Sequence, residues 1–140
     1  MMTDVVQAQV EAESAKAAAT AMYAFARYET VDRVVAARDA VRIFMDEMRY
    51  EGADKPEIAI WQLLFSIDDL RVERGLDWDQ VYGCGDASAS ATPGNLVGGL
   101  RMLCEAEGLK WTEMLEDVKQ NLHEIREGRY ADEAPGGPRP

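Results

Sequence analysis

The sequence contains few of the side chains that bind transition metals. It has a single histidine, His123, and two cysteines, Cys84 and Cys104. Together they cannot supply the four nitrogen or sulfur ligands of a structural zinc site. We therefore expect no zinc and no other cofactor, and we expect the two thiols to stay reduced in the cytoplasm.

Long apolar runs are missing as well. No stretch approaches the roughly 18 consecutive apolar residues of a membrane-spanning helix. The opening Met-Met-Thr-Asp has neither the basic segment nor the apolar core of a signal peptide. These absences predict a cytoplasmic protein that does not bind a membrane.

Positive charge is scarce. The chain has 15 Lys and Arg against 26 Asp and Glu, a formal net charge of −11. Such a surface repels phosphate backbones and gains nothing from counterion release, so we expect no direct nucleic-acid binding. An acidic protein is better suited to a basic surface on another protein, because opposite charges speed the encounter.

The length of 140 residues and the apolar fraction of 47% fit one globular domain. We assign residues 1–130 to a single helical domain. The small, polar segment 83–94 is expected to be a flexible surface loop. The segment 131–140, with three prolines and two glycines, is expected to be a disordered tail.

Helical periodicity dominates the first half of the chain. Residues 1–28 lack proline and glycine and are rich in alanine, which predicts an N-terminal helix whose polar first half could act as an arm. Thr30 is expected to cap a second helix that ends near Glu51 and Gly52. Apolar residues recur on one face of that helix at three- and four-residue steps, at Val34, Ala37, Val41, Phe44 and Met48.

Pro56 is expected to open a third helix, since proline fits a first helical position. The apolar stripe of this helix comprises Ile60, Leu63, Leu64, Ile67 and Leu70. Trp61 and Phe65 widen the arc, which predicts contacts on two sides, as in the central helix of a bundle or a dimer interface. The candidate interface residues are Trp61, Phe65, Val41, Phe44 and Met48.

An internal similarity appears when the chain is shifted by 33 positions. Gly75, Leu76 and Trp78 then align with Gly108, Leu109 and Trp111. Each copy predicts a helix, a turn with left-handed glycine and inward leucine, and a new helix. The last helix is expected to run from Trp111 to Arg126, with Gly128 ending it. The predicted fold is therefore all-α, a compact bundle of about five helices with two similar hairpins.

Acidic side chains three or four residues apart on a helix can hold Mg²⁺. One group comprises Asp46, Glu47 and Glu51, a second Asp68, Asp69 and Glu73, and a third Glu113, Glu116 and Asp117. In a chain with 26 acids such groups arise by chance. We therefore expect most of them to be solvated, and Gly98 and Gly99 to mark a close helix contact rather than a ligand site.

A local resemblance bears on the same acids. The run from Glu57 to Ile67, followed by Gly75-Leu76-Asp77, resembles the third helix and turn of the MazG-like all-α nucleoside triphosphate pyrophosphohydrolases. The resemblance implies a helical scaffold and magnesium held by paired acids on two core helices. At the corresponding positions this sequence has Ala59 and Gln62, faced by Val41 and Phe44, so the metal-binding acids are missing.

Three hypotheses follow from these observations. The first is a non-enzymatic, homo-oligomeric interaction protein, most simply a dimer, that binds a basic protein surface; one version is an inhibitor that fills a nucleic-acid channel, as some phage-encoded proteins do. The second is a divergent magnesium-dependent nucleotide pyrophosphohydrolase. The third is a structural subunit that docks through its first helix. The enzyme hypothesis would use acids drawn from Asp46, Glu47, Glu51, Asp68 and Asp69.

Overall fold

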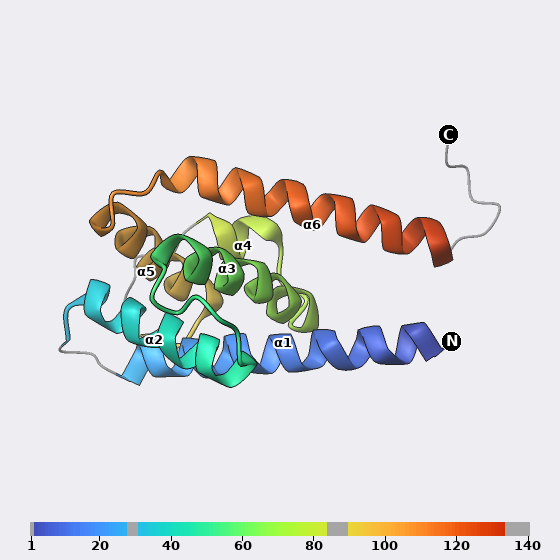
Figure 1. Cartoon of the computed structure of the whole chain (residues 1–140), viewed down its shortest axis with the longest axis horizontal. Coiled ribbons are helices and arrows are strands. Elements are labelled where there is room, and N and C mark those ends of the chain that lie inside the picture. Colours follow the sequence, from blue (N-terminus) through green and yellow to red (C-terminus); the bar gives the residue numbers. More distant parts are fainter. Residues whose placement is uncertain (1, 28–30, 84–89, 134–140) are drawn as a thin grey trace.

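The computed structural model describes residues 2–27, 31–83 and 90–133, and side-chain burial within residues 5–27, 31–83 and 90–125. Every regular element in these ranges is an α-helix (Figure 1). They are α1 (Met2–Arg27), α2 (Arg33–Met48), α3 (Pro56–Glu73), α4 (Trp78–Tyr82), α5 (Pro93–Ala106) and α6 (Trp111–Glu133). The predicted all-α bundle is confirmed, and the helix predicted after the first glycine-leucine turn is the short α4.

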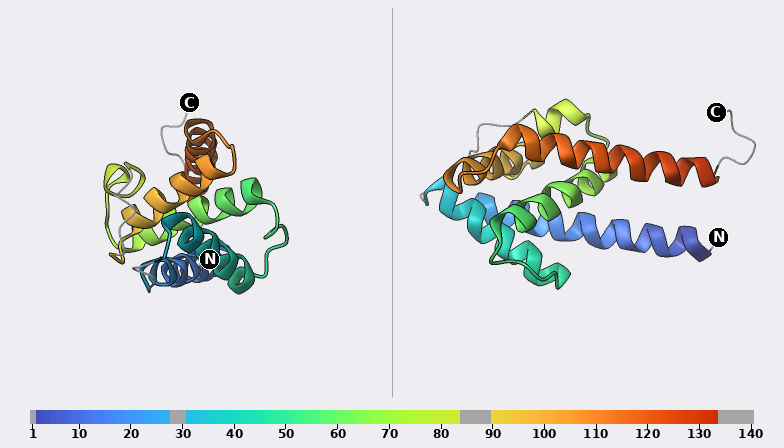
Figure 2. Two further views of the ribbon diagram at one scale, coloured as in Figure 1. Left: turned by 90° about the vertical axis from the view of Figure 1, so that its left-hand side faces the viewer. Right: turned by 45° about the horizontal axis from the view of Figure 1, so that its top comes forward.

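α3 is the central helix of the bundle. It packs against α1, α2, α5 and α6, and Figure 2 shows α6 and α1 on opposite sides of it. Its predicted apolar stripe is buried throughout, with Ile60, Leu63, Leu64, Ile67 and Leu70 at most 1% exposed. Trp61 and Phe65 are partly buried against the same core. Neighbours within the chain therefore cover most of the broad apolar arc.

Small residues let α1 approach its neighbours closely. Ala15, Ala17, Ala18 and Ala21 are buried where α1 packs on α2 and α3. Gly99 of α5 also faces α1, at a place where no side chain would fit. The predicted role of Gly99 in close helix packing is confirmed.

The two predicted glycine-leucine turns have the same hydrogen bonds. The N–H of Gly75 donates to the carbonyl of Val72, and the N–H of Leu76 donates to Arg71. Thirty-three residues later the N–H groups of Gly108 and Leu109 bond to the carbonyls of Glu105 and Cys104. Both glycines have positive φ, 65° and 73°. This pattern confirms the two Schellman turns and places α4 and α6 directly after them.

α2 differs from its prediction at both ends. The carboxylate of Asp32 caps it, accepting from the N–H groups of Val34 and Val35; the predicted cap, Thr30, lies outside the described residues. The helix ends at Met48, before the predicted Glu51, and Arg49 takes the left-handed conformation with φ 58°. A bulky residue there was not predictable from preference, since glycine usually occupies such positions.

α6 is longer than predicted. It continues through Gly128 to Glu133, so the expected stop at Gly128 is wrong, and the first residues of the predicted tail are helical. One glycine disfavours a helix by only about 1 kcal/mol, which the flanking turns offset. Within the expected loop 83–94, α5 already begins at Pro93, capped by Thr92. Cys84 and the neighbouring residues to 89, like residues 134–140, lie outside the described part.

α1 and α6 extend past the rest of the bundle at the same end of the molecule (Figures 1 and 2). They are the two longest of the described helices, at 26 and 23 residues. None of the helices in the described residues is both long and apolar enough to cross a membrane.

Candidate binding pocket between α3 and α6

The five predicted interface residues lie in different environments. Phe44 is fully buried and Val41 is 5% exposed, both in the core of this chain. Met48, Trp61 and Phe65 are partly buried and pack against that core. A side chain that is already buried adds no area to an interface, so only the last three can contact a partner.

Trp61 lines a pocket of about 590 Å³ between α3 and α6. That volume lies in the range of small-ligand and side-chain sites. The lining residues are Glu57, Ile58, Trp61, Gln62, Leu109, Lys110, Glu113, Met114 and Asp117.

Local sequence explains why these side chains meet. On α3, Trp61 follows Glu57 by four residues and Ile58 by three, so it lies one turn from both on the same side of the helix. On α6, Glu113 and Asp117 are likewise one turn apart, and the turn at Gly108 aims this helix back across α3. The pocket therefore forms where the opening turns of two helices face each other.

A hydrogen bond fixes the Trp61 side chain. Its indole Nε1–H donates to the carboxylate of Asp117 at 2.8 Å, and its ring stacks on Phe65 with centroids 5.3 Å apart. Stacking on one side and a charged acceptor at the edge hold the ring in one orientation. A held indole can contact a ligand with little loss of side-chain entropy.

The pocket is electrically negative. Its lining contains the carboxylates of Glu57, Glu113 and Asp117 against one ammonium group, Lys110, which lies 3.6 Å from Glu113. Ile58, 43% exposed, and the largely buried Met114 add apolar surface beside the indole. Carboxylates next to an aromatic ring and aliphatic carbon are suited to a Lys or Arg side chain, whose stem is apolar and whose head is cationic.

A larger cavity, about 760 Å³, lies between α2, α3 and α5. Its two arginines already have acidic partners: Arg38 pairs with Glu107 at 2.6 Å, and Arg42 pairs with Asp39. Its lining has three acids for two arginines, whereas the α3–α6 pocket has three acids for one lysine and therefore the larger excess of negative charge.

The acids predicted for a metal site do not gather together. Asp46, Glu47 and Glu51 are exposed on and after α2, and Asp69 is half-buried on α3. Among the residues that the structure describes, no three His, Cys, Asp or Glu side chains are placed to hold one ion.

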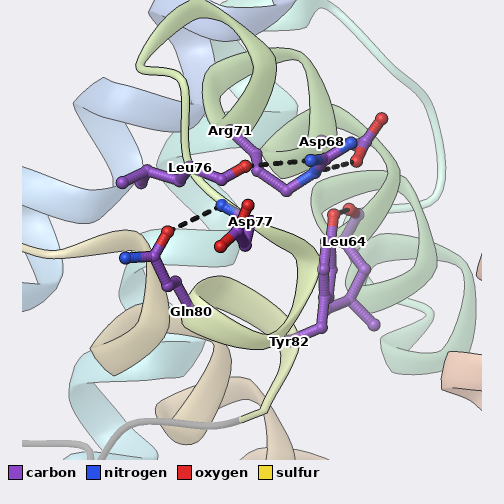
Figure 3. Close-up of polar contacts among 7 residues, drawn as sticks. All are labelled: Leu64, Asp68, Arg71, Leu76, Asp77, Gln80 and Tyr82. Carbon is purple, nitrogen blue, oxygen red and sulfur yellow. Dashed lines mark hydrogen bonds and ion pairs between the residues drawn. The ribbon is translucent and has the colours of Figure 1, made fainter.

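Asp68 corrects the expectation that the carboxylates lie in water. It is 1% exposed, and its carboxylate accepts from Nε of Arg71 at 2.7 Å (Figure 3). Arg71 also donates to the carbonyl of Leu76 at 2.9 Å, in the turn that follows. The ion pair therefore joins the end of α3 to the start of the next hairpin. Its three-residue spacing is visible in the sequence, but its burial depends on how α6 and α4 pack.

The positions compared with the pyrophosphohydrolases are mostly apolar contacts. Ala59 and Phe44 are fully buried and Val41 is almost so. Gln62 lines the pocket that contains Trp61, and Val41 and Ala59 line the cavity between α2, α3 and α5.

Comparison of the chain with protein-family models, curated proteins and solved structures gives no match. The chemistry of the α3–α6 pocket is therefore the basis for assigning a function. Sequence reasoning selected Trp61 and the acids of α6 separately but did not bring them together, because Trp61 and Asp117 are 56 positions apart. The contact would be detectable from sequence only through correlated substitutions at positions 61 and 117.

Proposed function

We propose that this protein is a non-enzymatic interaction module that binds a basic surface of another protein, with a Lys or Arg side chain entering the α3–α6 pocket. The observation that carries the proposal is the excess of carboxylates beside the held indole of Trp61. The net charge of −11 adds long-range attraction to the same class of partner.

Each group has a defined part in this binding. Glu57 and Glu113 supply the negative charge that attracts the cationic head from opposite walls of the pocket. Trp61 and Ile58 receive the aliphatic stem or the flat guanidinium face. Asp117 acts through Trp61, since it accepts the indole N–H.

Magnesium-dependent nucleotide hydrolysis is the alternative proposal, and it would need acids other than those of the compared family positions. Of those positions, Val41, Phe44 and Ala59 pack in the core, and Gln62 carries no charge. We favour binding because it uses groups that already meet in one pocket.

Calorimetric titration with a hexa-arginine peptide, and with a hexaglutamine peptide as the neutral control, tests the proposal. The double variant Glu57→Gln/Glu113→Gln is compared with Glu73→Gln/Glu124→Gln, which changes the net charge equally outside the pocket. We expect the pocket variant to bind hexa-arginine roughly fivefold more weakly, because each exposed ion pair contributes up to about 1 kcal/mol.

The same titrations at low and high salt measure the electrostatic share, and binding should weaken as salt rises. Equal weakening in both double variants would show that net charge alone is responsible and would contradict the assignment to the pocket. Salt-independent binding would contradict the electrostatic argument as a whole.

A further inference from the structure

The core-facing row of α1 continues past the core. Ser14, Ala21 and Phe25 are buried on this row, where α1 packs on the bundle. One and two turns earlier the row continues with Val10 and Val6, which are 51% and 56% exposed. An apolar stripe that runs on without a covering element is a typical docking surface.

α6 has the same property at its other end. Trp111, Met114, Val118 and Leu122 follow one another at three- and four-residue steps and are at most 9% exposed. The next member of the row is Ile125, which is 43% exposed. Both rows therefore leave the core at the end of the molecule where α1 and α6 extend past the other helices (Figure 2).

Side chains of both helices line one small cleft at the base of this region. α1 contributes Val10 and Ser14, α6 contributes Leu122 and Ile125, and α2 and α3 contribute Met48 and Phe65. The enclosed volume is about 100 Å³, too little for a small-molecule ligand. We call this cleft, together with the exposed Val6 that continues the α1 row beyond it, the α1–α6 groove.

The groove carries negative charge. The charged residues among the described lining are Glu11 and Asp69, with no Lys or Arg. The sequence agrees: α1 contains Asp4, Glu11 and Glu13 before its first basic residue, Lys16. In the last part of α6, residues 123–133, four acids stand against Arg126 and Arg129. A second copy of this chain would bring acids against acids, whereas a basic partner would be attracted.

We propose that the groove between α1 and α6 binds one amphipathic α-helix of another protein, with an apolar stripe along its inner face and Lys or Arg on its flanks. The backbone groups of both walls are bonded within their own helices, so the groove offers no edge for a β-strand. An inserted helix would cover Val6, Val10 and Ile125 and extend the bundle by one helix. This surface is distinct from the Trp61 pocket, and the two assignments can fail separately.

Fluorescence anisotropy with three labelled peptides of about 18 residues, or five helical turns, tests the inference. One has a leucine stripe with lysine on the remaining positions, one has the same composition in scrambled order, and one has the stripe with glutamate in place of lysine. The full chain is compared with Val6→Ser/Val10→Ser and with Val35→Ser. Val35 is the control because it is 49% exposed on α2 and lines the cavity between α2, α3 and α5 rather than the cleft.

We expect the lysine-stripe peptide to bind most tightly and the scrambled and glutamate peptides at least about tenfold more weakly. Val6→Ser/Val10→Ser should weaken the lysine-stripe complex roughly tenfold, since the two half-exposed valines together lose about 1.4 kcal/mol of apolar contact. Val35→Ser should leave it unchanged. Circular dichroism checks that the variants keep their helices.

Three results would overturn the inference. One is equal affinity for the striped and scrambled lysine peptides, which would mean that charge alone binds. Another is equal weakening by Val35→Ser and by Val6→Ser/Val10→Ser. The third is a dimer in sedimentation equilibrium that Val6→Ser/Val10→Ser dissociates, because the occupant of the groove would then be a second copy.

Discussion

Gly99 of α5 lies directly against the ring of Phe25 of α1. A Cβ built on Gly99 would come within 2.5 Å of Cε1 of that ring, and Phe25 is fully buried. The Phe25 ring is also covered by the guanidinium of Arg33, 4.8 Å from its centroid. The ring therefore has little freedom to move away, and α1 and α5 can approach this closely only because position 99 has no side chain.

We expect Gly99→Ala to destabilise the protein by about 1 kcal/mol. Alanine favours a helix over glycine by about 1 kcal/mol, but overpacking a core costs about 1 to 3 kcal/mol and should exceed that gain at so short a contact. Urea denaturation measures the change. Phe25→Leu in the Gly99→Ala background should cost less than Phe25→Leu alone, since the shorter side chain makes room. A more stable Gly99→Ala protein would show that the helices separate easily.

The buried ion pair at the end of α3 gives a second prediction. Asp68→Ala should lower the free energy of unfolding by roughly 3 kcal/mol, because it leaves the Arg71 guanidinium without its partner in a largely buried position. Asp68→Leu/Arg71→Met should cost less than Asp68→Ala, since it removes both charges. Thermal or urea denaturation of the two variants decides the point. If the double variant is the less stable, the bond from Arg71 to the carbonyl of Leu76 matters more than the ion pair.

Alkaline pH should weaken the fold through the buried thiol of Cys104 and the partly exposed hydroxyl of Tyr50. Burial, helped by the charges of Glu105 and Glu57, raises the pKa of the Cys104 thiol from 9.0 to about 11. Burial and then the charge of Asp69 raise the pKa of Tyr50 above its ordinary 10.0. Both groups hold their protons more tightly when folded, so their stabilising contribution is complete below about pH 9 and is lost as pH rises towards 11.

Urea denaturation between pH 8 and pH 11 measures this loss, which for one group cannot exceed about 1.4 kcal/mol per pH unit. Cys104→Ala should make the decline shallower, and Tyr50→Phe should do so mainly above pH 10. Tyr50→Phe keeps the edge-on contact with Phe44 and so serves as a conservative variant. An unchanged slope in Cys104→Ala would exclude the thiol as a cause.

Magnesium-dependent nucleotide hydrolysis gives a fourth prediction. Incubating the protein with Mg²⁺ and the common nucleoside triphosphates should release no pyrophosphate above the level without protein. Release that disappears in Glu47→Ala or Asp68→Ala would instead support the pyrophosphohydrolase alternative. Glu47→Ala is the more informative variant, since Glu47 is exposed and its loss should not disturb the fold.

Local signals in the sequence were sufficient for most of the architecture. Pro56 at the start of α3 and the turns at Gly75 and Gly108 depend on only a few neighbouring residues, and the structure has them where predicted. The buried stripe of α3 follows from helical spacing in the same way. Such features can be read from a single sequence because their causes lie within one or two helical turns.

The features that the sequence does not predict have a different cause. The burial of Asp68 and the contact of Trp61 with Asp117 depend on which helices cross, and no local pattern encodes this. Helix propensity alone predicts that the last helix ends at Gly128, yet α6 continues through this residue. The candidate pocket is likewise not predictable from local sequence, because its two walls, α3 and α6, belong to distant parts of the chain.

Three helix ends in this protein close in the same way, although only two have glycine. At the end of α2, Arg49 donates to Asp46 and Tyr50 to Met45, the arrangement seen at Gly75 and Leu76 and at Gly108 and Leu109. At each of these helix ends, the residue after the left-handed position is Tyr or Leu. Its side chain packs back against the core of the protein. A redesigned chain could therefore exchange the left-handed residue at a moderate penalty, but we expect loss of the following apolar anchor to misdirect the next helix.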